Sequence, residues 1–218
     1  MQRPSPFAGS LVEVAVIVLL CFGWFIVGSL SAVAAGFPAT PIDDQSFVGI
    51  IAYEVVFAGT ALALLHFRGR PLVSLMPRPT AMGSLVGLTL YGLTLVATWP
   101  LALAFSAQQV DAQPIQQMVG AASISLPALA ALSIVNGIYE ETFLNGYLVP
   151  ALQSFGAAFA VGVSVLVRVL YHLYQGPLGA LAVLFTGIIF GVYFWKTRKL
   201  WPVAFAHVFA DLAAFALS

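Results

Sequence analysis

Charged side chains are scarce in this sequence, and their scarcity excludes a soluble fold. Only 7% of the 218 residues are charged, whereas 61% are hydrophobic and the mean hydropathy is +1.01. Soluble domains carry about 25% charged residues, and the volume of their core limits how much apolar surface they can bury. We therefore expect lipid to cover the excess apolar surface of an all-α, polytopic transmembrane helical bundle.

Several sequence features that indicate particular functions are also absent. The single cysteine, Cys21, lies in an apolar stretch, which excludes a disulfide framework and a cysteine-type metal site. The formal net charge is zero, so nothing indicates a nucleic-acid partner. No HExxH sequence occurs, and no serine or cysteine stands in a recognised nucleophile context, which argues against covalent catalysis. The apolar stretch 10–35 exceeds the roughly 7–15 residues typical of a cleaved signal sequence.

The sequence does contain a series of apolar stretches, each close in length to the roughly 20 residues that a helix needs to cross a bilayer. We predict seven spans, at 10–35, 47–67, 81–106, 122–149, 156–175, 178–195 and 200–217. Together they form one membrane domain, in which 1–120 holds three generic helices and 121–218 holds the polar motifs. The basic residues Arg3, Arg68–Arg78 and Lys196–Lys199 all fall on one side, which predicts a cytoplasmic N-terminus. We expect the protein to lie in a bacterial cell membrane.

Ionisable residues inside these spans are the candidate functional residues, because each is costly at membrane depth. Glu140 and Glu141 are adjacent, about 100° apart on a helix, so they face different neighbours. One could act as a base while the other pairs with a structural partner. The alternative is a salt-bridged pair that only holds helices together. Glu54 could line a cavity or form a hydrogen bond to a neighbouring helix, and of these two alternatives we expect the second. For Glu13 we expect an interfacial position.

Two further spans carry polar pairs at helical spacing. Arg168 and His172 share a face of one helix, and His207 and Asp211 share a face of another. Depths counted along the helices are compatible with one cluster that includes Glu140, with His172 fitting worst. A carboxylate beside two imidazoles could activate water directly. The same set, His172, His207 and Glu140, could instead hold Zn²⁺ with one position left for water, and the sequence does not separate these alternatives.

The order of these motifs resembles a known family. Glu140-Glu141-x-x-x-Asn145-Gly146-Tyr147-Leu148 is similar to EExxxRGxL, the first motif of the CPBP family of CAAX-processing and bacteriocin-processing intramembrane proteases. These proteins are also called Abi proteins or type II CAAX prenyl endopeptidases. Arg168-x-x-Tyr171-His172 resembles the second motif, and Trp201-Pro202 followed by His207-x-x-x-Asp211 resembles the third. The likeness covers about 121–218.

The resemblance implies a role for each matching residue. Glu140 would activate the hydrolytic water and Glu141 would support the site. His172 would hold the water or polarise the scissile carbonyl, with His207 and Asp211 on the oxyanion side. The supporting residues are Arg168, Asn145 and Tyr171. The family usually has arginine where this chain has Asn145, and we predict that Arg168 pairs with Glu141 and compensates.

The sequence therefore predicts an intramembrane endopeptidase, with or without a metal ion such as Zn²⁺, that acts on membrane-associated peptides or proteins. Prenylated CAAX-type substrates are one candidate class. One alternative is a catalytically silent relative that serves as a membrane scaffold or immunity protein. Another is a small proton-coupled transporter, although no clear inverted repeat is present. The expected partners are the lipid bilayer and a substrate, and the oligomeric state stays open.

Overall fold

The protein is an all-α membrane bundle, as the sequence predicts. The computed structural model describes residues 11–38, 42–107 and 114–216, and these ranges contain helices and no β-strand. Four helical stretches are long and apolar enough to cross a membrane: Leu11–Ala34, Asp44–Phe67, Ala81–Phe105 and Ala157–Thr197. The last of these is divided at Gly176, whose φ of +82° belongs to the left-handed region that glycine favours.

The helices match the predicted spans to within a few residues. The long helices are α1 (Leu11–Ala34), α2 (Asp44–Phe67), α3 (Ala81–Ala107), α5 (Leu126–Glu141), α7 (Ala157–His172), α8 (Gly176–Thr197) and α9 (Leu200–Ala216). Between α5 and the short α6 (Val149–Ala151) lies a π-helix, η2 (Thr142–Leu148), so the chain stays helical from Leu126 to Ala151. The remaining short elements are η1 (Leu72–Leu75), η3 (Gln153–Phe155), η4 (Leu173–Gln175) and α4 (Pro114–Gly120), which the sequence did not predict.

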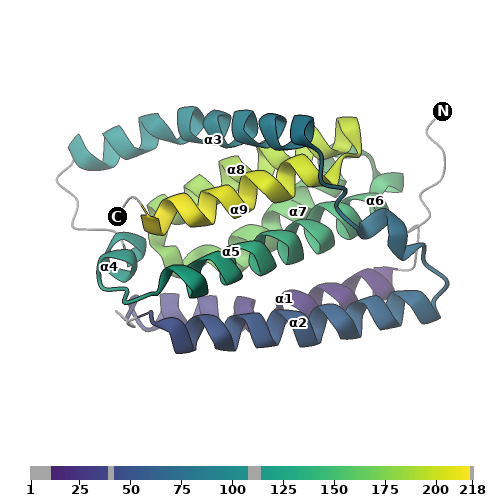
Figure 1. Ribbon diagram of the computed structural model, residues 1–218, viewed down its shortest axis with the longest axis horizontal. Coiled ribbons are helices and arrows are strands. Elements are labelled where there is room, and N and C mark those ends of the chain that lie inside the picture. The colour runs from purple at the N-terminus through teal and green to yellow at the C-terminus, as the bar shows by residue number, and fades with distance from the viewer. Residues whose placement is uncertain (1–10, 39–41, 108–113, 217–218) are drawn as a thin grey trace.

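The long helices run roughly parallel to one axis and form layers (Figure 1). Helices α1 and α2 make one outer layer and α3 the opposite one, with α5 and α7 beside α1 and α2, and α8 and α9 beside α3. Helix α5 packs against α2 and α9, while α7 packs against α1 and α8. The segment that carries the first polar motif is therefore central to the bundle.

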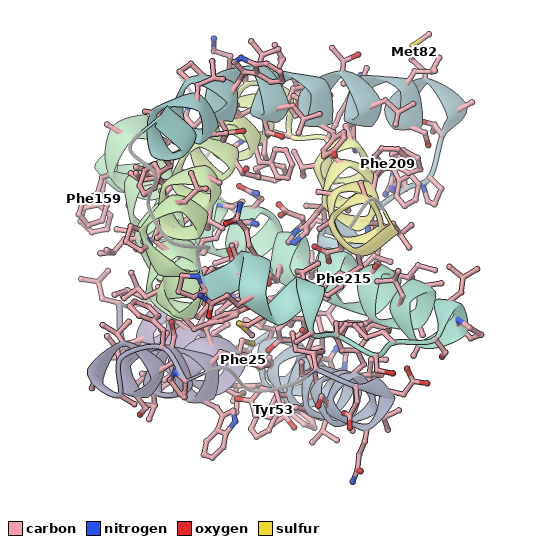
Figure 2. The ribbon with its side chains drawn as sticks, turned by 90° about the vertical axis from the view of Figure 1, so that its left-hand side faces the viewer. Phe25, Tyr53, Met82, Phe159, Phe209 and Phe215 are labelled. Carbon is pink, nitrogen blue, oxygen red and sulfur yellow. The ribbon has the colours of Figure 1, made fainter. Side chains whose placement is uncertain are left out.

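Burial distinguishes the central segment from the outer helices. Every residue from 139 to 152 is buried, which indicates a helix surrounded by protein on all sides. Outer helices instead present large apolar side chains outward. Figure 2 shows Phe159 and Met82 pointing away from the bundle, and they are 48% and 69% exposed. Lipid is the natural cover for such surfaces.

A glycine allows the closest helix contact near the polar motifs. A Cβ atom on Gly137 of α5 would lie 2.8 Å from Cγ2 and 2.9 Å from the backbone N of Val208 on α9. Any side chain there would overlap its neighbour, so only glycine lets the two backbones approach this closely. Because Gly137 is three residues before Glu140 and Val208 follows His207, this contact brings the carboxylate and the imidazole together.

Charges separate between the two ends of the bundle. The described basic residues other than Arg168 lie at the end where α2 meets α3 and α8 meets α9, whereas Asp43 and Asp44 lie at the other end (Figure 1). Asp43 caps α2, and the hydroxyl and backbone N–H of Ser46 lower the pKa of its carboxyl group. The separation agrees with the predicted topology, but which end is cytoplasmic stays a prediction. Arg3 and Asp111 lie outside the described residues.

Glu13, for which the sequence predicts an interfacial position, lies in the first turn of α1 with its carboxylate inside the protein. Glu13 is 6% exposed and accepts hydrogen bonds from Arg68 and from both Nε and Nη2 of Arg70. The Tyr147 hydroxyl lies 3.3 Å from the same carboxylate. Two arginines can neutralise a buried carboxylate, which explains why Glu13 lies inside the protein. This cluster ties α1 and the Arg68–Arg70 loop to the π-helix.

Candidate active site

Both carboxylates of the first motif lie in the bundle interior at the end of α5. Glu140 is 4% exposed and Glu141 is fully buried. The π-helix starts at the next residue, Thr142. Wide π-turns occur mostly at functional sites, where they shift the direction of side chains relative to a regular α-helix.

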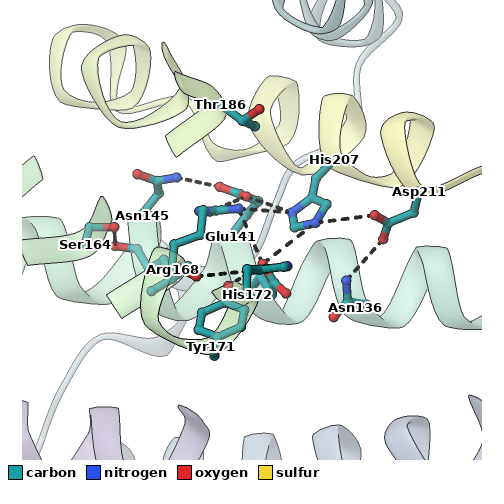
Figure 3. Close-up of polar contacts among 12 residues, drawn as sticks. Asn136, Glu141, Asn145, Ser164, Arg168, Tyr171, His172, Thr186, His207 and Asp211 are labelled. Atoms are coloured by element: carbon teal, nitrogen blue, oxygen red, sulfur yellow. Dashed lines mark hydrogen bonds and ion pairs between the residues drawn. The ribbon is translucent and has the colours of Figure 1, made fainter. Parts of the chain in front are cut away.

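Arg168 of α7 contacts both carboxylates. Its Nη2 donates to Oε1 of Glu141 over 2.6 Å, and its Nη1 lies 3.4 Å from Oε2 of Glu140. The predicted ion pair between Arg168 and Glu141 is therefore present (Figure 3). The guanidinium is only 3% exposed, so its charge is balanced by these carboxylates and not by solvent.

Glu141 has no free oxygen with which to act as a base. Oε2 accepts a hydrogen bond from the Asn145 amide, and Oε1 lies 2.6 Å from Arg168 and 2.9 Å from Nδ1 of His207. Asn145 is one turn further along the same helical segment, where the family has arginine. In this chain the cation comes from α7 and Asn145 adds a neutral donor. Glu141 thus connects α5, η2, α7 and α9.

His207 and Asp211 on α9 lie beside Glu140. With Nδ1 of His207 directed to Glu141, its Nε2 lies 3.7 Å from Oε2 of Glu140 and 3.7 Å from Oδ1 of Asp211. These distances are too long for direct hydrogen bonds. Asp211 also accepts a hydrogen bond from the Asn136 amide over 3.1 Å. Asn136 is one turn before Glu140, so both lie on the same face of α5.

Tyr171 and His172 complete the cluster from the end of α7. The Tyr171 hydroxyl donates a hydrogen bond to Oε2 of Glu140. Nδ1 of His172 lies 3.0 Å from the backbone oxygen of Arg168. A carbonyl oxygen only accepts, so Nδ1 carries a proton and Nε2 remains available for another partner. Figure 3 shows His172 in the same group as Arg168, Tyr171 and His207.

A cavity of about 460 Å³ opens onto part of this cluster. Glu140, His172, Asp211 and Asn136 line it, together with mostly apolar side chains from α1, α2, α4, α5 and α9. Glu141, Arg168, Asn145 and His207 are not part of its lining and lie behind the first set. The structure therefore divides the predicted residues into a group that faces the cavity and a group that supports it.

Two cavity residues were not assigned to the site from the sequence. Asn136 could have been found, because it is four residues before Glu140 and shares its helix face. Glu54 of α2 was expected to bond a neighbouring helix, and that expectation is wrong. Its carboxyl group lines the cavity, and its Oε2 has no hydrogen-bond partner among the described residues.

The residues considered as zinc ligands do not form a coordination set. Within the described ranges, no three His, Cys, Asp or Glu side chains are placed to hold one metal ion. His207 directs Nδ1 to Glu141 and His172 directs Nδ1 to a backbone oxygen, so in each imidazole only Nε2 could bind a metal. The Arg168 guanidinium, 3.4 Å from Glu140, already supplies a positive charge where a cation would bind. No step of the chemistry below runs through a metal.

Comparison with known proteins agrees with the motifs. Neither the curated proteins nor the solved structures gave a match. A family model described as "Type II CAAX prenyl endopeptidase Rce1-like" matches residues 122–213. The matched region runs from the start of α5 almost to the end of α9, and so contains both carboxylates, the buried arginine and both histidines of the cluster. Residues 122–213 therefore match the Rce1-like type II CAAX prenyl endopeptidases, which agrees with the resemblance of the motifs to the CPBP family.

Proposed function

We propose that the protein is an intramembrane endopeptidase that hydrolyses peptide bonds of membrane-associated peptides or proteins with a water molecule activated by Glu140. One observation carries this proposal. Glu140 faces a cavity together with His172, whereas its neighbour Glu141 is bonded by three donors. Adjacent carboxylates with such different surroundings have different roles, one reactive and one structural.

The geometry supports the following reaction. Glu140, oriented by Tyr171, takes a proton from a water molecule held between its carboxylate and the free Nε2 of His172. The water oxygen bonds to the scissile carbonyl carbon. The resulting oxyanion is stabilised by the Asn136 amide of α5 and by Nε2–H of His207 on α9, which is a donor in the doubly protonated form of the imidazole. The C–N bond then breaks, and Glu140 passes its proton to the departing nitrogen. The products are a carboxylate and an amine.

Asp211 acts in this scheme through its neighbours. A carboxylate cannot stabilise an oxyanion directly, because both are acceptors. Asp211 instead holds the Asn136 amide at 3.1 Å and places a negative charge 3.7 Å from Nε2 of His207. Both contacts favour the donor groups that the oxyanion needs.

The walls of the cavity favour an apolar substrate. Phe22, Phe25, Phe47 and Phe215 line the same space as Glu140. Such walls can take the apolar side chains or the lipid group of a membrane-bound peptide. We propose prenylated CAAX-type peptides as the first class to test, and unmodified membrane peptides as the second.

Purified protein should be compared with Glu140→Gln on a farnesylated CAAX peptide and on a library of membrane peptides. The expected result is cleavage by the wild type and a loss of about 10²–10⁴-fold in Glu140→Gln, the range that general acid–base catalysis contributes. Melting temperatures should agree between the two proteins. Equal cleavage by both would exclude Glu140 as the base. No cleavage by either, with ion or substrate flux through the wild type, would favour a transporter.

Asn145 is the observation that favours a catalytically silent scaffold as the second candidate. The structure weakens that alternative, because Arg168 supplies the positive charge that Asn145 lacks. Capture of a partner that survives both Glu140→Gln and His207→Ala, with no cleavage by the wild type, would support the scaffold.

A further inference from the structure

Two residues that line the Glu140 cavity each carry an unpaired polar atom. Glu54 is 2% exposed, and Ser133 of α5 is fully buried. Among the described residues, neither Oε2 of Glu54 nor Oγ of Ser133 has a hydrogen-bond partner. Both residues line the cavity that contains Glu140 and His172. The third unpaired atom, Oδ1 of Asn145, belongs to a residue outside this lining.

Such atoms are exceptional in folded proteins. Most buried polar side-chain atoms have at least one partner, and each unpaired one destabilises the fold. Two such residues, from two different helices, line the same cavity. They indicate a binding site for a ligand that donates hydrogen bonds. A carboxyl group has an acceptor lone pair in either protonation state, and a serine hydroxyl can also accept.

The geometry of α5 places Ser133 relative to Glu140. Ser133, Asn136 and Glu140 are at positions i, i+3 and i+7, so they lie on one face of α5 toward the cavity. Seven residues of α-helix rise about 10.5 Å. An extended peptide covers that length with about three residues.

A substrate peptide in this cavity needs hydrogen-bond acceptors for its backbone. A peptide bond can be attacked only where the chain is unwound, and an unwound segment has backbone N–H groups without intrahelical partners. The apolar walls keep water from satisfying them, and each unpaired N–H costs free energy. Acceptors beyond the scissile bond would therefore hold an extended segment in place.

We propose that Glu54 and Ser133 form a substrate subsite that accepts hydrogen bonds from backbone N–H groups of an extended peptide, with Ser133 about three residues from the bond that Glu140 hydrolyses. The subsite rests on the proposed protease function, but it makes a separate statement about binding. It defines Glu54 and Ser133 as specificity-determining residues that do not touch the reacting atoms.

Peptide binding can be measured without hydrolysis. Fluorescence anisotropy with a fluorescein-labelled, farnesylated CAAX peptide is measured in a Glu140→Gln background, combined with Glu54→Gln, Glu54→Met or Ser133→Ala. Glu54→Met is expected to weaken binding about tenfold, the value of one hydrogen bond. Glu54→Gln keeps an acceptor oxygen and should stay within about threefold. Glu54→Met should melt no lower than its parent, because it removes an unpaired buried group.

Ser164→Ala is the matched control for Ser133→Ala. Ser164 is also buried, but its hydroxyl donates to the backbone oxygen of Leu144 and it does not line the cavity. Ser164→Ala should bind the peptide like its parent, whereas Ser133→Ala should bind it several times more weakly, about threefold to tenfold.

A series of peptides in which one backbone N–H at a time is replaced by an ester oxygen identifies the donor. At one position, the ester should lower the affinity of the parent protein for the peptide about tenfold. The same ester should not lower the affinity of Glu54→Met any further. Equal losses in both proteins at every position, unchanged binding by Glu54→Met, or no peptide binding at all would overturn the subsite. Ester-sensitive binding with no cleavage by the wild type would instead refute only the protease function. Cleavage that Glu54→Met leaves unchanged would refute only the subsite.

Discussion

Replacing Arg168 by leucine should test how the site balances its charges. The substitution leaves Glu141 fully buried with only Asn145 and His207 as partners, and it removes the cation 3.4 Å from Glu140. Leucine fills a similar part of the core but neutralises nothing. The side chain of Arg168 is 3% exposed, so solvent cannot take over its role.

The expected destabilisation follows from the burial of the pair. Removing one partner of a buried ion pair costs about 3–5 kcal/mol, because the other charge is left uncompensated. For a chain of this size each kcal/mol lowers the melting temperature by about 2–4 °C. Arg168→Leu should therefore melt roughly 6–20 °C below the wild type in the same detergent. Cleavage should also fall, because the substitution removes the positive charge that lies 3.4 Å from Glu140.

A second substitution can restore a positive charge beside Glu141. Asn145→Arg introduces a cation one turn from Glu141, at the position where the family carries arginine. The double variant Arg168→Leu/Asn145→Arg should recover most of the lost melting temperature and cleavage. Arg78→Leu, which removes an exposed loop arginine, is the control and should melt like the wild type. The reasoning is refuted if Arg168→Leu alone melts and cleaves like the wild type.

Three further predictions concern the surroundings of the site. Gly137→Ala should separate α5 from α9, because its Cβ would lie 2.8 Å from Val208, and should lower both melting temperature and cleavage. Gly59→Ala, with open space at its Cβ, should not, and equal effects of the two would contradict the packing argument. Glu13→Gln leaves Arg70 without its buried counter-charge and should lower the melting temperature without changing KM, so a change in KM alone would contradict a structural role. Dialysis against a chelator should leave cleavage unchanged, and activity restored by Zn²⁺ after such dialysis would refute the metal-free scheme.

The apolar spans could be predicted because lipid imposes a simple rule on them. Each span needs enough apolar residues to cross the bilayer, and punctuation such as Gly36-Phe37-Pro38 marks where α1 ends. The pairing of Arg168 with Glu141 was also predictable, since a buried arginine needs a carboxylate. The short helix α4 was missed because seven residues carry too little periodicity.

Other features depend on tertiary packing and could not be read from spacing. Helix α2 buries few side chains, so nothing in its pattern shows which face Glu54 takes. Depth counting along the helices was compatible with one cluster, although His172 fitted worst, and it could not include the π-helix. The π-helix has no sequence period that distinguishes it from an α-helix, so it could not be predicted.

The all-round burial of residues 139–152 has a consequence for biogenesis. None of the four stretches long and apolar enough to span a membrane in the described ranges includes Glu140 or Glu141. A charged residue at the centre of a nascent helix makes its insertion into the membrane less favourable by about 2.5–3.5 kcal/mol. The segment with Glu140 and Glu141 is therefore poorly retained by lipid until α7 and α9 have been synthesised, because these later helices carry Arg168 and His207. Ribosomes that stop before Leu200 would release chains with an incompletely neutralised segment, which membrane quality control should degrade.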